Sequence, residues 1–346
     1  MKIGIIGASL SGLVAGKHLG QAGHDVTIIE KTRMLGGRLA SLDDGNGNIF
    51  DYGVSHFNAN KSDFKAFVEY LEEQELIKEW TSRLDYYDGE QLHDLNPNRS
   101  PQLQYTSVKG FTPIASQLSR WVDVKSEEKA GGLTHIGADR SKKRAWMINL
   151  TDISVFECDA VILATPAVQS YGILLTAQDE TPARKILRYI DEFKYEPSYA
   201  IMASYKDQAA PEWDAIESMK SGIKLITNES SKRNNADTSL VIHSSGDFVR
   251  KYKEEDPEQI STLLLRHANE ITGQKWLTQP DSKHIYFWKY AECVNPTDEE
   301  FMELEMEEAP LAIVGDYLGG NSVESAYLSG LRLAEYWNQK YELAPV

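Results

Sequence analysis

The first thirty residues alternate between short apolar runs and a helical repeat. Residues 3–6 form one apolar run, and residues 26–29 form a second that ends in the carboxylate of Glu30. Between them, residues 10–22 carry apolar side chains at helical spacing. Continuous apolar runs are typical of strands covered on both faces, as in a parallel sheet. The pattern therefore predicts a strand–helix–strand unit over residues 2–30.

A turn with the spacing of a nucleotide-binding motif joins the first strand to the helix. Gly7 and Gly12 occupy the first and third glycine positions of G-x-G-x-x-G, and Ser9 occupies the second. In such a unit the turn amides and the helix N-terminus face a pyrophosphate, and a carboxylate ending the second strand binds a ribose hydroxyl. We expect Glu30 to take that role. A side chain at the second position is a mild steric cost, which we expect the Ser9 hydroxyl to offset by donating to a phosphate oxygen.

Two further glycine motifs follow the second strand. Gly36 and Gly37 allow the backbone to fold closely over a ligand, and Arg38 adds a fixed positive charge that can neutralise a diphosphate. Residues 50–57 then predict a short strand followed by a glycine turn. These motifs extend the predicted nucleotide site beyond the first unit.

Periodicity also predicts the remaining elements. Residues 61–80 carry apolar side chains at helical spacing, and residues 86–90 are typical of a hairpin turn. A helix is predicted from Gly110 through Trp121, and a charged turn at 140–144 joins two strands of a β-meander. Strands are expected at 133–136, 146–150, 160–164, 198–205, 222–227, 238–243 and 311–314, and helices at 182–190, 257–271 and from Val323 onward.

The composition limits the class of protein. The chain has 346 residues with 41% hydrophobic and 25% charged side chains, which is typical of a globular protein with more than one domain. Its formal net charge of −16 disfavours binding to nucleic acid or to an anionic membrane. No apolar run approaches the length of a membrane span, and the first strand begins too early to leave room for a signal peptide. We therefore predict a cytoplasmic protein without nucleic-acid or membrane partners.

The number and spacing of the cysteines also favour a cytoplasmic protein. The chain has two cysteines, Cys158 and Cys293, with no C-x-x-C pair and no metal-ligand spacing. This pattern excludes a disulfide framework and a redox-active dithiol, fits a reducing compartment, and predicts no metal site. The oligomeric state is left open.

The motifs together resemble a known family. The turn with Ser9, the carboxylate of Glu30, the Gly-Gly-Arg segment and the D-x-G turn at 51–53 resemble the opening of the flavin-containing amine oxidase superfamily. Near the other end, Gly315-Asp316 follows a buried strand and precedes the last helix, as in the same family. The resemblance implies non-covalently bound FAD, rather than NAD, as the cofactor.

The resemblance also implies a fold and a division into domains. The expected fold is α/β, with an FAD-binding Rossmann-type domain (GR2-like, p-hydroxybenzoate-hydroxylase-like) and an interleaved mixed-sheet substrate domain. The FAD-binding domain is expected at 1–57, 111–166 and 291–346, and the substrate domain at 58–110 and 167–290.

Cofactor contacts follow from the motifs and the resemblance. The strand ending at Thr165-Pro166 resembles one that lies near the adenosine half, and Asp316 corresponds to a residue that binds the ribityl chain or pyrophosphate. The N-terminus of the last helix carries about half a positive charge, which supports hydride acceptance at flavin N5. The expected cofactor-binding residues are Gly7, Ala8, Ser9, Leu10, Ser11, Gly12, Glu30, Lys31, Gly36, Gly37, Arg38, Leu39, Gly53, Val54, Ser55, Lys129, Ala130, Ala164, Thr165, Pro166, Trp288, Gly315, Asp316, Ser322, Val323 and Ala326.

Four side chains are expected to be catalytic. His243 ends a strand that resembles the V-x-H-A strand of bacterial renalase-like flavoproteins, and a histidine pKa is easily tuned. Trp288 and Tyr290 belong to a W-K-Y-A motif of the family; we expect only one of them to face the flavin pocket, because side chains alternate along a strand. His56 completes the set and follows Ser55, at a position where relatives usually carry Gln-Tyr.

The resemblance is strongest to the renalase-like branch. Such enzymes oxidise 2- and 6-dihydro-NAD(P) with FAD and pass the electrons to O2, giving H2O2. The electron-rich dihydropyridine needs no strong base, and none is evident in the sequence. The expected partners are a small-molecule reductant and O2.

Other functions stay open at this point. An amine or amino-acid oxidase of the same fold would oxidise a C–N bond, whereas a carotenoid- or porphyrin-type desaturase would need a long apolar tunnel. An NAD-dependent dehydrogenase or a non-catalytic nucleotide-binding protein would not need the Gly-Gly-Arg, D-x-G and C-terminal Gly-Asp motifs.

Overall fold

The predicted strand–helix–strand pattern forms β1 (Lys2–Ile6), α1 (Leu10–Gln21) and β2 (Asp25–Ile29). The two strands pair in parallel, with Ile3 beside Val26 and Ile6 beside Ile29. The structure, a computed structural model, describes residues 1–97, 99–136, 144–177, 181–218, 221–304 and 309–341.

The chain divides into two units. Unit 1 comprises residues 1–39, 112–194 and 293–346, and unit 2 comprises residues 40–111 and 195–292. These boundaries differ from the expected ones mainly for residues 40–57, which lie in unit 2, and for residues 167–194, which lie in unit 1. Residues 111, 291 and 292 also lie in unit 2 rather than with the nucleotide-binding segments.

Particular contacts explain both differences. Phe50 packs with Met202 and Val241 in a buried cluster of unit 2. In unit 1, the Thr176 hydroxyl accepts from the Leu133 amide at 2.6 Å and donates to the Leu133 carbonyl at 3.0 Å. These contacts pack each segment into its observed unit.

A six-stranded sheet forms the centre of unit 1, in the order β19-β20-β13-β1-β2-β9. The pairings from β20 to β9 are parallel, and β19 is antiparallel to β20. The strands besides β1 and β2 are β9 (Asp123–Lys125), β13 (Ala160–Leu163), β19 (Met302–Leu304) and β20 (Leu311–Ile313).

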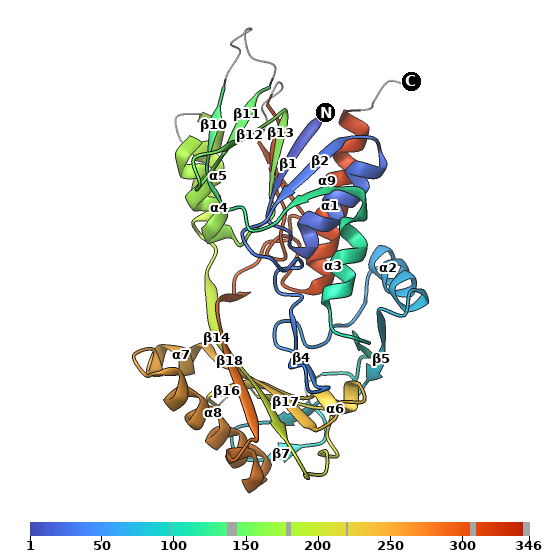
Figure 1. Cartoon of the computed structure of the whole chain (residues 1–346), viewed down its shortest axis with the longest axis vertical. Helices are drawn as coiled ribbons and strands as arrows, with labels where there is room; N and C mark the ends of the chain where they lie inside the picture. Colours follow the sequence, from blue (N-terminus) through green and yellow to red (C-terminus); the bar gives the residue numbers. More distant parts are fainter. Residues whose placement is uncertain (98, 137–143, 178–180, 219–220, 305–308, 342–346) are drawn as a thin grey trace. The chain divides into compact units, whose positions relative to one another are not determined.

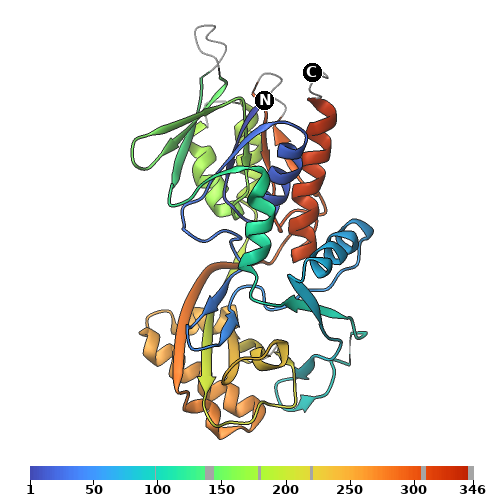
Figure 2. The same cartoon turned by 45° about the vertical axis from the view of Figure 1, so that its right-hand side comes forward.

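Each face of this sheet is covered by a different layer. Helices α1 and α9 (Val323–Lys340) lie side by side on one face, as Figures 1 and 2 show. They approach so closely that a Cβ on Gly330 would lie 2.2 Å from the Ser11 carbonyl oxygen. On the other face, a Cβ on Gly4 would lie 2.6 Å from Ile148 of the predicted meander. Both glycines are therefore required by packing.

The meander, three α-helices and two 3₁₀ turns complete the described part of unit 1. The predicted turn at 140–144 lies largely outside the described residues, since 137–143 are not among them. The elements are β10 (Ala130–His135), β11 (Trp146–Leu150), β12 (Val155–Cys158), α3 (Thr112–Leu118) with a 3₁₀ turn at Ser119–Trp121, α4 (Ala167–Leu174) with a 3₁₀ turn at Leu175–Ala177, and α5 (Thr181–Ile190).

Unit 2 is built on a seven-stranded sheet with the order β18-β14-β17-β16-β15-β6-β7. Figure 1 shows α7 (Gly246–Tyr252) and α8 (Pro257–Thr272) along one face of it, where a large apolar cluster is buried. The strands are β6 (Asp85–Tyr87), β7 (Leu92–His93), β14 (Tyr195–Tyr205), β15 (Ala215–Ser218), β16 (Ile223–Asn228), β17 (Thr238–Ser244) and β18 (Ser282–Cys293).

Shorter elements complete unit 2. The predicted hairpin at 86–90 is confirmed, because β6 and β7 pair antiparallel around Gly89. The other elements are β3 (Ser41–Asp43) paired with β4 (Ile49–Asp51), β5 (Ile77–Thr81) paired with β8 (Gln104–Ser107), α2 (Ser62–Glu73), α6 (Glu229–Lys232) and a 3₁₀ turn at Lys275–Thr278.

The helix predicted over residues 61–80 is wrong in its second half. Helix α2 ends at Glu73, and Glu75 adopts a left-handed φ of 55°, which a helix cannot continue through. The chain then forms β5, whose terminal residues Ile77 and Thr81 are buried. The apolar residues near the end of the predicted helix therefore belong to a strand.

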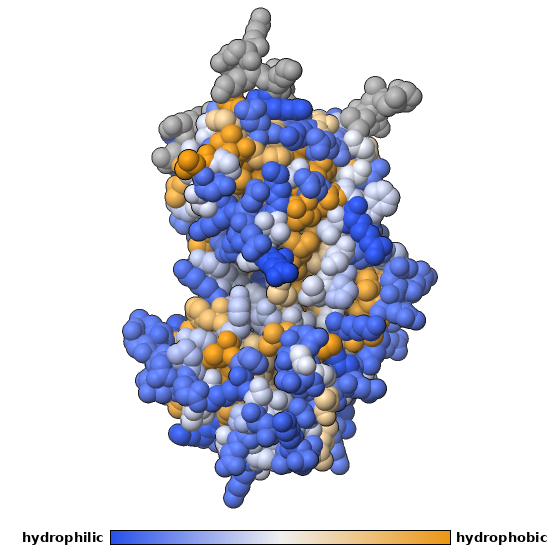
Figure 3. Space-filling model, in the orientation of Figure 1, coloured by the Kyte–Doolittle hydropathy of each residue, from blue (hydrophilic) through white to orange (hydrophobic). Residues whose placement is uncertain are grey.

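The surface agrees with the charged composition. Most of the face shown in Figure 3 is covered by hydrophilic residues. Within the described part of the chain, no helix combines the length and apolar character needed to cross a membrane.

Candidate functional site

The carboxyl ends of the parallel strands in unit 1 converge at one edge. The Gly7 amide donates to the Ile29 carbonyl at 2.9 Å, and the Ala164 amide donates to the Ile6 carbonyl at 2.8 Å. The Val314 amide likewise donates to the Leu163 carbonyl at 2.9 Å. We call these ends of β1, β2, β13 and β20, with the turns that follow them, the carboxyl edge. It is where open α/β sheets bind ligands.

The turn after β1 leaves no room for larger residues at its two glycines. Gly7 has a φ of +102°, and a Cβ on Gly12 would lie 2.4 Å from the Gly7 carbonyl oxygen. Ser9, at the second glycine position, has extended dihedrals of −70° and 169° and is the N-cap of α1. Its side chain therefore causes no backbone strain.

The Ser9 hydroxyl has a different partner from the one expected. It donates to the Ala164 carbonyl at 2.8 Å and accepts from the Gly12 amide at 3.4 Å. The hydroxyl thereby joins the turn to the end of β13. Its donation to a phosphate oxygen stays a prediction.

Glu30 is buried at the end of β2 and already holds three donors. One carboxylate oxygen accepts from the Ala8 amide at 2.9 Å, and the other accepts from the Thr32 amide at 2.9 Å and the Thr32 hydroxyl at 2.8 Å. The Glu128 amide donates to the Glu30 carbonyl at 2.9 Å, which brings the segment containing Lys129 to the same end of the sheet. The ribose contact of Glu30 stays a prediction.

Arg38 and Asp316 were both predicted to contact the cofactor, and the structure pairs them with each other. A guanidinium nitrogen of Arg38 forms a short ion pair with the Asp316 carboxylate. Gly36 and Gly37 precede Arg38 with φ of +106° and +60°, and the Gly36 amide donates to the Ala8 carbonyl at 2.7 Å. The glycines thus bring this ion pair back to the turn after β1.

The last helix begins at the same edge. Helix α9 starts at Val323, as predicted, with Ser322 as its N-cap and a reciprocal capping box between Ser322 and Ser325. The Gly315 amide donates to the Ser329 hydroxyl at 3.0 Å inside the helix. The Gly-Asp motif is thereby fixed to α9.

The carboxyl edge fits a dinucleotide of the FAD type. Its glycines keep Cβ atoms out of the turn, its helix N-termini favour a diphosphate, and Glu30 is a carboxylate at the ribose position. Gly53, Val54 and Ser55, also predicted to bind the cofactor, belong to unit 2. Their contact with FAD stays a prediction.

The predicted catalytic residues lie in unit 2. His56 is half-buried, and its Nδ1 lies 2.8 Å from the Ser55 hydroxyl. Its ring contacts the Trp80 ring at 5.4 Å between centroids. Burial, followed by Lys232 and His243, lowers the pKa of His56 to about 3. The His56 imidazole is therefore uncharged at neutral pH.

His243 lies in β17, between Ala200 of β14 and Leu225 of β16. Its side chain is buried, and its Nε2 has no hydrogen-bond partner among the residues that the structure describes. Burial, followed by Lys232 and Lys224, lowers its pKa to about 3 as well. We call Ser55, His56, Trp80 and His243 the histidine site.

Trp288 and Tyr290 do not alternate as expected. They are two positions apart in β18, and a strand has a period of two, so both project from the same face. The Trp288 indole donates to the Tyr52 carbonyl at 2.8 Å and stacks on the Tyr52 ring at 5.6 Å, whereas the Tyr290 ring contacts Tyr195 at 5.7 Å. The expectation that only one could face a given side is wrong.

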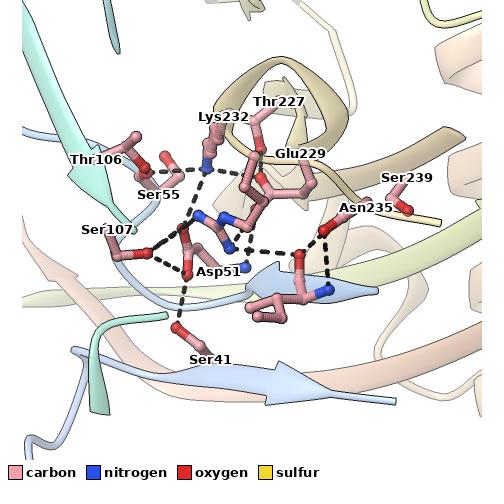
Figure 4. Close-up of polar contacts among 12 residues, drawn as sticks. Ser41, Asp51, Ser55, Thr106, Ser107, Thr227, Glu229, Lys232, Asn235 and Ser239 are labelled. Atoms are coloured by element: carbon pink, nitrogen blue, oxygen red, sulfur yellow. Dashed lines mark hydrogen bonds and ion pairs between the residues drawn. The ribbon is translucent and has the colours of Figure 1, made fainter. Parts of the chain in front are cut away.

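Four charged side chains of unit 2 lie close together, and we call Asp51, Glu229, Lys232 and Arg233 the charge cluster. Figure 4 labels the first three of them. Lys232, Glu229 and Asp51 have fully buried side chains, and Arg233 is 7% exposed. The Lys232 ammonium lies 2.6 Å from a Glu229 oxygen and 3.6 Å from an Asp51 oxygen, and Arg233 forms a short ion pair with Asp51. The two positive and two negative charges balance within the protein interior.

The sequence analysis missed this cluster. Residues 229–233 are a polar run after an apolar strand, which is typical of a solvent-exposed loop. Asp51 lies 178 residues before Glu229, and no spacing connects the two. The D-x-G motif drew attention to Asp51, but it does not indicate that this carboxylate pairs with an arginine.

Comparison with protein families agrees with the geometry of the carboxyl edge. The model of an NAD(P)-binding Rossmann-like domain matches residues 5–71, and the model of the flavin containing amine oxidoreductases matches residues 133–336. The chain belongs to the flavin containing amine oxidoreductase family. Its class is accordingly that of the FAD-dependent oxidoreductases.

Curated relatives match only a short segment. The chain is 37% identical over 57 residues to a zeta-carotene desaturase from Synechocystis sp., which is 16% of this chain and 12% of that protein. It is 45% identical over 53 residues to a 4,4'-diapophytoene desaturase (4,4'-diaponeurosporene-forming) from Staphylococcus aureus, which is 15% of this chain and 10% of that protein. The matches thus leave most of both relatives uncovered.

Solved structures share the whole fold at low identity. A protein from Exiguobacterium sp. assigned as a protoporphyrinogen oxidase has a TM-score of 0.77 and 13% identity, over 98% of this chain and 99% of that one. Cyclohexylamine oxidase from Brevibacterium oxydans has a TM-score of 0.75 and 11% identity, over 99% of each chain. At such identities the likeness establishes the fold.

Proposed function

We propose that this chain is a renalase-like oxidase, which takes a hydride from a dihydronicotinamide isomer, 2- or 6-dihydro-NAD(P), to N5 of FAD. The electrons then pass to O2 and give H2O2. FAD, when bound, supplies the hydride acceptor. The small-molecule reductant, O2 as the acceptor and a cytoplasmic location are parts of the same proposal.

The uncharged state of the two histidines carries the proposal. Because burial and Lys232 lower the pKa of both His56 and His243 to about 3, neither is an effective proton acceptor at neutral pH. A substrate that arrives as an ammonium ion must first lose a proton, which calls for a base with a pKa near the working pH. A dihydropyridine is electron-rich and gives up a hydride without a base.

The aromatic side chains of unit 2 suit a planar substrate. The Trp288 indole is fixed by its hydrogen bond to the Tyr52 carbonyl at 2.8 Å, and the Trp288 and Tyr286 rings lie 4.6 Å apart. Rings fixed in this way orient a flat ligand at little cost in conformational entropy.

An amine oxidase is the second candidate. Solved structures of the same fold include a cyclohexylamine oxidase and a putrescine oxidase bound to putrescine. The rings of Tyr52, Tyr286 and Trp288 could also attract a cationic amine through their faces.

Anaerobic stopped-flow absorbance separates the two candidates. The purified protein with FAD is mixed with 6-dihydro-NAD, with ordinary 4-dihydro-NAD and with a panel of amines. We expect the 6-dihydro isomer to bleach the oxidised-flavin band rapidly and 4-dihydro-NAD to leave it unchanged. Admission of air should then yield H2O2.

Two outcomes would contradict the proposal. Bleaching by an amine alone would identify an amine oxidase. A protein that binds FAD but is bleached by none of these reductants would have neither activity.

A further inference from the structure

A closed ring of contacts joins Lys232 to three members of the histidine site, Ser55, His56 and Trp80. The Lys232 ammonium donates to the Ser55 carbonyl at 2.9 Å, and the Ser55 hydroxyl lies 2.8 Å from His56 Nδ1. The His56 ring contacts the Trp80 ring at 5.4 Å, and the Lys232 ammonium lies 5.2 Å from the centre of that same ring. Lys232 therefore fixes His56 from two sides, through the backbone of Ser55 and through Trp80.

The ammonium of Lys232 is held in place by the rest of the charge cluster. It donates to Glu229 at 2.6 Å, while Asp51 is shared with Arg233. Glu229 also accepts from the Thr227 hydroxyl at 2.8 Å and from the Asp51 amide at 3.0 Å. With these contacts the ammonium has little freedom to move away from Ser55.

The electrostatic effect on the histidines is nevertheless that of a positive charge. Besides burial, the groups that disfavour protonation of His243 are Lys232 and Lys224, and those that disfavour protonation of His56 are Lys232 and His243 itself. Lys224 is paired with Glu292. A location that disfavours an imidazolium ion also disfavours any other cation placed there.

A separate observation, at His243, indicates that a ligand binds at the histidine site. Its side chain is nine-tenths buried, and its Nε2 has no partner within the described part of the chain. A buried polar atom without a partner costs free energy that a hydrogen-bonding ligand recovers. A neutral imidazole has one donor and one acceptor nitrogen, so it is suited to an uncharged group that can both donate and accept.

We propose that Lys232 is a positioning residue, which makes the histidine site a subsite for an uncharged polar group of the substrate, such as a primary carboxamide, and excludes alkylammonium groups. The choice of a carboxamide rests on the proposed function, because dihydronicotinamides carry one. The positioning of His56 by Lys232 does not depend on it.

The first experiment measures binding without turnover. The FAD-loaded protein is titrated with nicotinamide, which is uncharged, and with benzylamine, which is cationic at pH 7, while the side-chain ¹⁵N signals of His56 and His243 are followed by NMR. We expect nicotinamide to shift both signals and benzylamine to shift neither. Shifts caused by benzylamine and not by nicotinamide would overturn the proposal, as would no shift with either probe.

The second experiment removes the ammonium together with its partner, so that the interior keeps its charge balance. In K232M/E229Q we expect about a tenfold weaker affinity for nicotinamide and a rise of about tenfold in the proton affinity of both histidines. The matched control is K283M/E258Q, which removes a Lys–Glu pair at the surface of the same unit and should change neither quantity. Wild-type values in K232M/E229Q would overturn the positioning role.

These results are separable from those for the proposed function. Failure of 6-dihydro-NAD to reduce the flavin would contradict the proposed reaction and leave the NMR titrations as they stand. If reduction does occur, K232M/E229Q should raise KM for 6-dihydro-NAD about tenfold with kcat nearly unchanged. An equal fall in kcat with constant KM would contradict a binding subsite.

Discussion

The carboxyl edge of unit 1 and the histidine site of unit 2 are built in opposite ways. The edge is made mainly of backbone: main-chain amides, glycines that exclude Cβ atoms, and the first turns of α1 and α9. The histidine site is made mainly of side chains, and it is joined to the buried charge cluster through the bond from Lys232 to the Ser55 carbonyl. Gly7 and Gly12 of the edge therefore tolerate no added side-chain atoms, whereas the histidine site should tolerate no unbalanced charge.

The largest effect is expected when one charge of the buried cluster is removed, which tests the difference between the two sites. K232M leaves Glu229 buried without its ammonium partner, and loss of one member of a buried pair typically costs about 3–5 kcal/mol. We expect a loss of this size in the free energy of unfolding, measured by urea denaturation. K283M, at the surface, should cost less than about 1 kcal/mol. Equal losses in the two variants would contradict the distinction.

The second largest effect is expected from acid, which should lower the free energy of unfolding through His56 and His243. The ordinary pKa of histidine, 6.5, is lowered to about 3 in both His56 and His243. Between these values the unfolded chain binds protons that the folded protein does not, so the free energy of unfolding falls as the pH is lowered and is unaffected above pH 6.5. The slope approaches about 1.4 kcal/mol per pH unit for each histidine.

Urea denaturation at a series of pH values measures this slope. In H56Q/H243Q the pH dependence between 6.5 and 4 should become shallower than in the wild type, because the carboxylates still titrate and the two rings do not. Identical slopes in the two proteins would show that the histidines are not held uncharged.

In unit 1, the addition of a single methyl group should lower both stability and FAD affinity. G12A places a Cβ 2.4 Å from the Gly7 carbonyl oxygen, so the backbone of the turn must shift. We expect a loss of about 1–3 kcal/mol in stability and at least a tenfold weaker binding of FAD, measured from flavin fluorescence. Unchanged FAD affinity would contradict the placement of the diphosphate at this turn.

The smallest effect is expected at the position that departs from the glycine motif. Ser9 is unstrained and caps α1, and glycine is itself an acceptable N-cap. S9G should therefore change stability by only a few tenths of a kcal/mol and FAD affinity by less than about threefold. A large gain in FAD affinity would show that the serine side chain obstructs the diphosphate.

The same contrast explains what could be predicted from the sequence. Gly7, Gly12 and Glu30 lie at fixed spacings because a backbone turn, a helix start and a strand end follow one another along the chain. The unit of β1, α1 and β2 was accordingly found, and the start of α9 at Val323 was placed correctly. The partners of Ser9 and Arg38 were not, because both side chains bond to segments more than 150 residues away.

The histidine site was only half predictable. His56 and His243 were selected because of the resemblance and because histidine titrates readily, but the residue that controls their charge was not. Lys232 lies in a short polar segment that the sequence gives no reason to bury. Only the folded unit shows that this segment is buried and that Asp51, 178 residues before Glu229, lies beside Lys232 and Arg233.

The close approach of α9 to α1 has a consequence for how the protein is made. Ser11 emerges from the ribosome long before Gly330, whose backbone packs against it. Until α9 has been synthesised, the face of α1 that α9 covers therefore stays exposed. A nascent chain released before residue 323 would lack α9, so it would expose this face of α1 to chaperones and proteases.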